Sequence, residues 1–225
     1  MFQGYTQETV DFLWGIRFNN DREWFMPRKE IYQQHLLQPT KDLAEQVYDA
    51  LSAELEGEPL MVKVSRIYRD ARRLYGRGPY KDHLWFSIRT GDKDWTGHPT
   101  FYFEISPEYY SYGMGFWAAG TEPMAIYRRA VEERPEELAK LVRAFNRQDV
   151  FTLTGPAYAR PKGDVGPLLQ PWYQKKSVNL EHTMPLDEKI FDPAWADEII
   201  ARLKTLIPFY RYFARLCAEI YREQA

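Results

Sequence analysis

Cysteine, long apolar runs and secretion signals are all scarce in this sequence, and each shortage excludes a class of protein. The single cysteine, Cys217, rules out an internal disulfide and favours a reducing, cytoplasmic location. No apolar stretch approaches the roughly 18 residues that a membrane-spanning helix needs, so no membrane partner is expected. The first residues lack the basic and apolar segments of a signal peptide.

The motifs of several common chemistries are also missing. The sequence contains no G-x-x-x-x-G-K-[ST] phosphate loop and no G-x-S-x-G nucleophile elbow. Its 4 histidines are scattered without the spacing of metal ligands, so neither a metal site nor a cofactor is predicted. Whether the protein is an enzyme, and which reaction it would catalyse, are therefore left open by the sequence.

The composition is that of a folded protein with an unusual share of aromatic residues. The chain has 225 residues, long enough for one good core, and 16% of them are aromatic. With a net charge of −2, the whole molecule is not a general polyanion binder, so any nucleic-acid role requires a local basic patch. We predict a single domain with a helical part (residues 1–57), a main sheet (60–117) and a mixed helical and loop part (120–225).

Apolar residues at helical spacing dominate the first quarter of the chain. Thr6 is a suitable N-cap for a helix that ends near Phe18, with Val10, Leu13, Trp14 and Phe18 on its buried face. Two further helices are expected over residues 22–37 and 40–55, separated by a break at Pro39.

The period then changes from 3.6 to 2, which predicts strands. Short turns and strands with one polar face indicate an antiparallel sheet. The fold class is therefore α+β, with a curved antiparallel sheet packed by helices and a long C-terminal helix that is kinked or divided at Pro208. The main strands are expected over residues 60–69, 84–90, 100–106 and 109–117, with two more near 151–153 and 178–182.

A basic run follows the first strand. Of the sixteen residues from Arg66 to Lys81, six are Arg or Lys and only Asp70 is acidic, which gives this run a charge of about +5. Guanidinium groups match the oxygens of phosphates and carboxylates, so a small phosphorylated or carboxylated molecule is the favoured partner. The candidate ligand-binding residues are Arg66, Arg69, Arg72, Arg77, Tyr80 and Lys81, assisted by Arg22 and Lys29.

Several alternatives remain open for this run. Arg66 interrupts the apolar face of its strand, so either a bulge near Ser65 shifts the register or the guanidinium points inward. The loop can also be a solvated one in which Asp70 is an internal counter-ion. If the protein is an enzyme, Asp70 is the weak candidate for a base, because neighbouring cations keep a carboxylate ionised.

Two other functions compete with small-anion binding. One is binding of RNA or single-stranded DNA, with Tyr68, Tyr75 and Tyr80 stacking on bases between the cations. The other is a role in protein–protein interaction through the aromatic surface, and the oligomeric state is left open. Gly113 and Gly115 leave a flat strip on one strand, where packing against a neighbour is favoured over a ligand.

Taken together, these residues resemble the pattern of a known family. The N-terminal part is Asn19-Asn20-x-Arg22-x-Trp24-Phe25 with Lys29 and Tyr32, and the central part is Arg66-Ile67-x-Arg69-Asp70-x-Arg72 followed by Pro79-Tyr80-Lys81. Weaker support comes from Gly113-x-Gly115 and Arg160-Pro161-Lys162-Gly163. On these residues the chain resembles, over nearly its whole length, the mainly bacterial family catalogued as domain of unknown function 2461. The resemblance implies a cytoplasmic α+β domain of unassigned role and transfers no catalytic residue.

The sequence departs from the family's pattern at two places. Family members usually carry an aromatic residue and a lysine-containing polar turn where this chain has residues 73–78, and a proline where it has Ala118 and Ala119. The resemblance therefore does not determine the shape of the basic loop.

Overall fold

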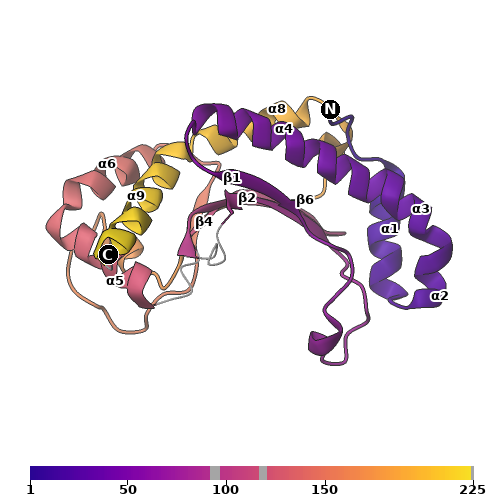
Figure 1. The fold of residues 1–225 in the computed structure, drawn as a ribbon, viewed down its shortest axis with the longest axis horizontal. Coiled ribbons are helices and arrows are strands. Elements are labelled where there is room, and N and C mark those ends of the chain that lie inside the picture. The colour runs from indigo at the N-terminus through magenta and orange to yellow at the C-terminus, as the bar shows by residue number, and fades with distance from the viewer. Residues whose placement is uncertain (92–96, 117–120, 224–225) are drawn as a thin grey trace. The chain divides into compact units, whose positions relative to one another are not determined.

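A computed structural model describes residues 1–91, 97–116 and 121–223. Within these residues, six strands form one open antiparallel sheet in the order β1-β2-β3-β4-β6-β5 (Figure 1). The predicted α+β class and its C-terminal helix are confirmed. The strands are β1 (Leu60–Val64), β2 (Leu84–Thr90), β3 (Thr100–Ile105), β4 (Tyr109–Phe116), β5 (Thr152–Thr154) and β6 (Val178–Pro185).

The chain divides into two compact units, each built from three separate segments. The first unit contains Met1–Ile88, Tyr102–Tyr112 and Thr183–Ala201, and the second contains Arg89–Phe101, Gly113–His182 and Arg202–Ala225. The prediction of a single domain, with three parts that meet near residues 57 and 117, stays a prediction. Each unit is described by itself below.

The first helix of the first unit, α1 (Gln7–Phe18), begins where the sequence predicts but buries a different face. Its start is confirmed, because the Thr6 N–H donates to Thr9 Oγ1 at 3.1 Å in a capping box. The predicted buried face is confirmed at Leu13, which is fully buried, and wrong at Phe18, which is 75% exposed and whose ring stacks on the half-buried Trp14 ring at 5.7 Å. The face that packs is made of Thr9, Phe12, Leu13 and Ile16.

A second helical run covers residues 22–54 without the break predicted at Pro39. Residues Tyr32–Leu37 form a π-helical segment, in which the Gln38 N–H donates to the Gln33 carbonyl. Pro39 lies in the first turn of the following helix, where its missing N–H is not needed. The segments are α2 (Arg22–Phe25), η1 (Met26–Arg28), α3 (Lys29–Ile31), η2 (Tyr32–Leu37) and α4 (Gln38–Glu54).

The core of the first unit lies between α4 and the sheet. Leu43, Val47 and Leu51 of α4 are fully buried, as the helical spacing predicts. On the sheet side, Phe103 contacts Trp195 edge-on, with 5.8 Å between ring centroids, and Tyr110 contacts the same indole at 4.8 Å. This aromatic packing holds β3 and β4, and β3 is paired with β2, one of the two strands from which the candidate site projects.

The second unit contains helices from the C-terminal half and the outer strands. Two helices of this unit are separated at Arg134, and the predicted division at Pro208 is confirmed as two abutting helices. Phe213 stacks on Phe116 at 4.6 Å in the core. The space over Gly113 is filled by the Leu180 backbone, since a Cβ atom there would lie 2.0 Å from the Leu180 oxygen. The helices are α5 (Thr121–Glu133), α6 (Pro135–Phe145), α7 (Gln170–Tyr173) and α9 (Ile207–Glu223), with α8 (Trp195–Lys204) shared between the units.

Candidate functional site

The basic run forms a hairpin arm that extends from edge strand β1 and returns into β2 (Figure 1). We call residues 66–83 the arm. Its two sides are joined by a bridge between Tyr68 and Tyr80, and the Arg69 N–H donates to the Pro79 carbonyl at 2.8 Å. The short helix η3 (Ala71–Arg73) lies at its tip. The strand predicted to reach Arg69 ends at Val64. The arm therefore continues the hairpin of β1 and β2 beyond the end of the sheet.

The pairing slips by two residues at the junction between sheet and arm. Ser65 faces Trp85: its N–H donates to the Trp85 carbonyl at 2.8 Å, and its Oγ accepts from the Trp85 N–H at 3.2 Å. Tyr68 then faces Tyr80, so one side of the hairpin advances three residues while the other advances five. The bulge alternative is therefore confirmed, and the inward guanidinium is wrong, because Arg66 is exposed while Ser65 and Ile67 are buried.

Asn20 locks the root of the arm to the corner between α1 and α2. Its Oδ1 accepts from the Tyr80 N–H at 2.9 Å, and its Nδ2 donates to the Tyr80 carbonyl at 2.9 Å. Gly78 allows this approach, because a Cβ atom there would lie 2.4 Å from the Asn20 backbone oxygen. One amide thus satisfies both polar groups of a single arm residue.

An aromatic cluster packs under the same root. The Phe25 ring stacks on Tyr80 at 4.2 Å, and Tyr68 meets Tyr80 at 5.4 Å. Burial raises the pKa of Tyr80, and burial also raises that of nearby Tyr32 to about 12. Tyr80, a predicted ligand residue, is only 3% exposed, so its ring anchors the arm.

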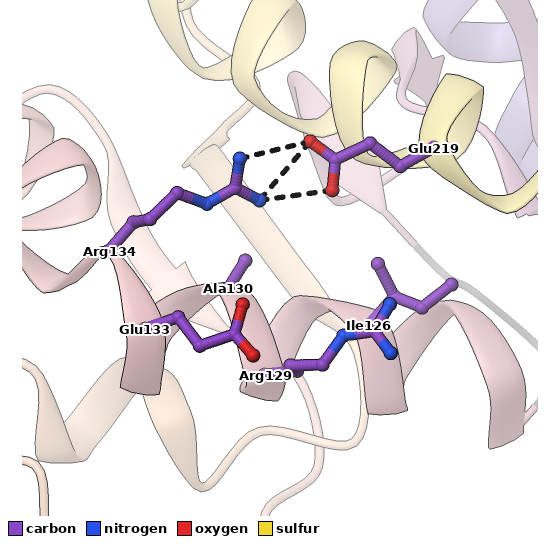
Figure 2. Close-up of a pocket in the computed structure, with 6 residues that line it drawn as sticks. All are labelled: Ile126, Arg129, Ala130, Glu133, Arg134 and Glu219. Atoms are coloured by element: carbon purple, nitrogen blue, oxygen red, sulfur yellow. Dashed lines mark hydrogen bonds and ion pairs between the residues drawn. The ribbon is translucent and has the colours of Figure 1, made fainter. Parts of the chain in front are cut away.

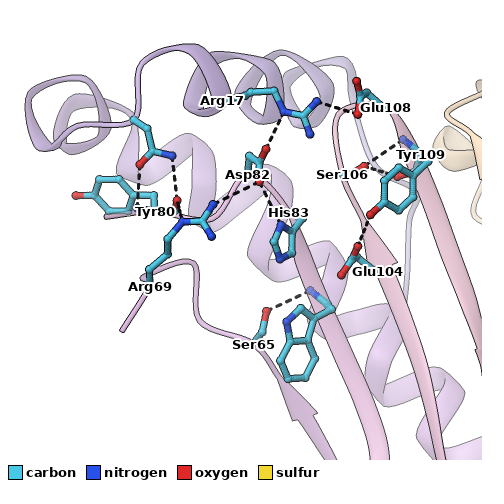
Figure 3. A network of polar contacts seen from close by, with 12 residues as sticks. Arg17, Ser65, Arg69, Tyr80, Asp82, His83, Glu104, Ser106, Glu108 and Tyr109 are labelled. Atoms are coloured by element: carbon cyan, nitrogen blue, oxygen red, sulfur yellow. Dashed lines mark hydrogen bonds and ion pairs between the residues drawn. The ribbon is translucent and has the colours of Figure 1, made fainter. Parts of the chain in front are cut away.

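Asp82 is the centre of the polar network in Figure 3, which the sequence analysis missed. Its carboxylate accepts from Arg17 Nε at 2.7 Å, lies 3.2 Å from His83 Nδ1 and lies 3.7 Å from Arg69 Nη2. Burial opposes ionisation of Asp82, but the hydrogen bonds from Arg17 and His83 outweigh it and lower the pKa. Arg17 also pairs with Glu108 at 3.0 Å, so this network joins α1, the arm and the β3–β4 turn.

Two of the predicted arginines are engaged within the arm itself. Arg69 Nε donates to the Tyr80 carbonyl at 2.7 Å, and its side chain is largely buried. Arg72 binds Asp70 through two hydrogen bonds of 3.1 and 2.9 Å, although its side chain is 88% exposed. Asp70 also caps η3 by accepting from the Arg72 N–H at 3.0 Å. The internal counter-ion alternative for Asp70 thus has a structural basis, and its role as a base stays a prediction.

The remaining predicted cations lie on the surface. Arg66, Arg77, Arg22 and Lys29 are exposed, and Arg77 Nε donates to the Leu74 carbonyl at 3.3 Å. Lys81 is half-buried with its Nζ 5.5 Å from the centre of the Trp85 ring. Burial lowers the pKa of Lys81, and the charges of Arg69 and Arg66 lower it further.

Two tyrosines of the arm remain in contact with solvent. Tyr68 is 48% exposed and Tyr75 is 82% exposed. Tyr75 also has a φ of +48°, a left-handed conformation that a bulky residue rarely adopts. The structure therefore places exposed aromatic rings and exposed cations on the same projecting arm.

Comparison with known proteins finds a family that the sequence matches. The family described as "Conserved hypothetical protein (DUF2461)" matches residues 8–212. The chain belongs to that family. No curated protein matches it. In this DUF2461 member the motif residues Asn20, Phe25 and Tyr80 hold the root of the arm in place.

The polar network of this DUF2461 protein shows which signals the sequence analysis passed over. Asp82 follows the last residue of the basic run directly, and its partner Arg17 stands just before the Asn19-Asn20 motif. Both carry charge next to a motif, which was the available signal. Within the described residues, no helix has the length and apolar character needed to cross a membrane. The same residues contain no cluster of three side chains suited to a metal ion.

Proposed function

We propose that the protein binds single-stranded nucleic acid, RNA or DNA, along its arm. The observation that carries this proposal is the combination of a locked root with exposed cations and tyrosines beyond it. Single-stranded nucleic acids are bound by cationic surfaces that follow the backbone and by aromatic rings on which bases stack. Arg66, Arg72 and Arg77 supply the first element, and Tyr68 and Tyr75 supply the second.

The charge distribution supports a polyanionic partner. The arm contains six Arg or Lys residues and two Asp, a net charge of +4, whereas the whole chain carries −2. The rest of the molecule therefore has a net charge of −6, so the attraction for a polyanion is confined to local basic regions, of which the arm is one. Burial is the main cause of the lowered pKa of Lys81, and the charges of Arg69 and Arg66 lower it further, as expected where the local potential is positive.

The placement of the cations favours a polymer over the small anion that the sequence favours. A small ligand requires several cations to converge on one centre, but Arg69 is turned to Tyr80 and Asp82. The ion pair of Arg72 with Asp70 lies at the surface, where a backbone phosphate can replace the carboxylate. Cations spaced along a hairpin suit a chain of phosphates instead. A small phosphorylated or carboxylated molecule remains the competing ligand, and the experiment below separates the two.

Tyr75 supplies a further argument. A left-handed conformation costs an ordinary residue roughly 1 kcal/mol, and glycine or asparagine adopts it more easily. An exposed tyrosine in that conformation, at 82% exposure, packs little surface in return. Strained residues of this kind occur at ligand-binding sites, where a stacking role accounts for the side chain.

The cytoplasmic location expected from the sequence is part of this proposal. RNA is abundant there, and Cys217 is free and buried, which suits a reducing compartment. A bacterial origin, which the resemblance implies, is compatible with the same location.

The test is fluorescence anisotropy with a labelled single-stranded oligonucleotide of mixed sequence, at several salt concentrations. We compare the wild type with the triple variant R66Q/R72Q/R77Q. The logarithm of the affinity falls with the logarithm of salt by about 0.7 per phosphate contact, so the variant's slope is expected to be shallower by about 2. The matched control is K41Q/K140Q/R147Q, which removes three exposed cations outside the arm.

Each outcome of this titration decides the matter. Salt-dependent binding that the arm variant loses and the control keeps supports the proposal. Absence of binding at low salt, or equal loss in both variants, overturns it. A mononucleotide that competes as well as the oligonucleotide would favour the small-anion ligand instead.

A further inference from the structure

A second cationic group lies in the second unit, around the ring of Tyr158. The chain that carries Tyr158 is held by backbone hydrogen bonds: the Tyr158 N–H donates to the Gln174 carbonyl at 2.9 Å, and the Lys176 N–H donates to the Pro156 carbonyl at 2.7 Å. These bonds prolong the pairing of β5 with β6. The ring therefore stands on an ordered hairpin extension.

Three cations from three segments surround this ring. Lys162 Nζ lies 4.6 Å from the ring centroid, Lys176 Nζ lies 5.3 Å away, and Arg128 Cζ of α5 lies 5.4 Å away. We call Arg128, Tyr158, Lys162 and Lys176 the Tyr158 cluster. A ring has only two faces, so at least two of the like charges share one face. The ring attracts each cation, but the cations repel one another.

The backbone next to Lys162 is held in place at Gly163. Gln170 Nε2 donates to the Gly163 carbonyl at 3.0 Å. The Gly163 backbone lies against Tyr173, because a Cβ atom there would lie 3.1 Å from the Tyr173 hydroxyl. The chain at Lys162 is thereby fixed beside the ring.

No carboxylate neutralises the Tyr158 cluster within residues 1–91, 97–116 and 121–223. None of its three cations takes part in an ion pair there, and Arg128 Nη1 is buried without a hydrogen-bond partner. The neighbouring carboxylate of Glu132 is engaged by the Tyr173 hydroxyl. A buried donor that lacks an acceptor is costly, so the described residues leave the hydrogen bonding of Arg128 incomplete.

Arg134, which directly follows α5, is neutralised by a carboxylate of the chain. Figure 2 shows its guanidinium facing Glu219, with three hydrogen bonds of 3.0 to 3.2 Å between the two side chains. Both arginines are half-buried. Among the described residues a carboxylate pairs with Arg134 and none pairs with Arg128, so that the positive charge of the Tyr158 cluster remains available to a ligand.

We propose that the Tyr158 cluster binds the phosphate dianion of a small molecule. Three cations with no carboxylate are neutralised better by a doubly charged group than by a carboxylate. A guanidinium fork and two ammonium groups are standard donors to phosphate oxygens. This site is separate in its residues from the arm, so the inference does not depend on the proposed function.

The experiment uses inorganic phosphate as the probe, with its 31P NMR line width and the melting temperature of the protein as readouts. The titration is made at about pH 8, where phosphate groups are dianionic. We expect saturable binding by the wild type, and affinity at least about tenfold weaker in K162Q/K176Q. Acetate at the same ionic strength is expected to bind at least about tenfold more weakly than phosphate.

Matched variants separate this site from general charge effects. K140Q/R147Q, which removes two exposed cations elsewhere, and the arm variant R66Q/R72Q/R77Q are both expected to bind phosphate as the wild type does. Tyr158→Phe keeps the ring and the affinity, whereas Tyr158→Leu removes the surface that gathers the cations and lowers the affinity. Circular dichroism verifies that each variant is folded.

Three results would overturn the proposal. They are the absence of saturable phosphate binding, equal binding by the wild type and K162Q/K176Q, and acetate binding as tight as that of phosphate. The fate of the arm proposal is independent, because it is read from oligonucleotide binding alone.

Discussion

The arm and the Tyr158 cluster are both rich in cations, but they differ in where their counter-ions come from. The arm's cations stand close together in sequence, and several are answered within the hairpin, as Arg72 is by Asp70. The cluster's cations come from separate segments and form no ion pair with a carboxylate in the described residues. The density of charge in a sequence shows where the cations are. Their ion pairs in the folded protein determine which of these cations a ligand can contact.

The largest expected effect on stability comes from the close packing at the root of the arm. Gly78→Ala places a methyl group against the Asn20 backbone oxygen, at 2.4 Å, so the root must open. We expect the free energy of unfolding to fall by about 3 kcal/mol, measured by urea denaturation. Gly97→Ala is the control, since no atom of the residues that the structure describes lies within 4 Å of its added Cβ atom. Equal, small losses in both variants would contradict the lock.

The next effect concerns Asp82, whose counter-ion role has no equivalent in the Tyr158 cluster. Asp82→Asn leaves Glu108 as the remaining carboxylate partner of Arg17 in the network, and we expect a loss of about 1 to 2 kcal/mol at neutral pH. The pKa of Asp82 is lowered in the folded state, so its stabilisation is present above the unfolded pKa and disappears as pH falls through the folded one.

Urea denaturation of this variant at neutral and at acidic pH checks the sign. The difference from the wild type should shrink below about pH 4, where the unfolded carboxyl becomes protonated. Asp11→Asn is a control, because Asp11 is exposed and accepts only from Gln7 at 2.9 Å. A deficit that does not change with pH would show that the charge of Asp82 is not what stabilises the root.

A crossed experiment sharpens the comparison directly. The arm variant R66Q/R72Q/R77Q should lose at least about tenfold in oligonucleotide affinity, roughly 1.4 kcal/mol, and keep its phosphate affinity. K162Q/K176Q should show the reverse. Anisotropy and 31P NMR on the same preparations provide both readouts. If either variant lost both activities, the two regions would be parts of one surface rather than two sites.

The smallest effect concerns the tip of the arm. Tyr75→Asn replaces a strained tyrosine by a residue that tolerates the left-handed conformation, so stability should rise by up to about 1 kcal/mol. Oligonucleotide affinity should fall a few-fold, because one stacking surface is lost. Thermal denaturation and anisotropy together test this, and changes of the same sign in both would contradict a stacking role for Tyr75.

Local patterns were sufficient to predict much of the fold. Strand β2 (Leu84–Thr90) has the predicted bounds, and Phe101, Phe103 and Ile105 alternate into the core as expected. The division at Pro208 follows from its missing N–H. The buried face of α1 was not predictable in the same way, since Phe12 and Trp14 are both aromatic and only packing decides which is buried.

The candidate site was predictable only in part, for the same reason. The charge of the basic run is a local property, but the contact of Arg17 with Asp82 joins residues 65 positions apart. The two-residue slip at Ser65 depends on how two strands meet, which neither strand encodes alone. The Tyr158 cluster draws on α5, a loop and the segment before β6, so no window of sequence contains it.

The position of the lock on the arm has a consequence for how such a protein changes over time. The outermost cross-strand hydrogen bond joins Arg69 to Pro79, so residues 71–77 lie beyond it and contribute little to the packing underneath. Insertions or substitutions in that stretch can alter what the tip touches while the scaffold keeps its stability. The tip of the arm can therefore change while its root stays the same. It is the segment in which to seek differences of specificity between relatives.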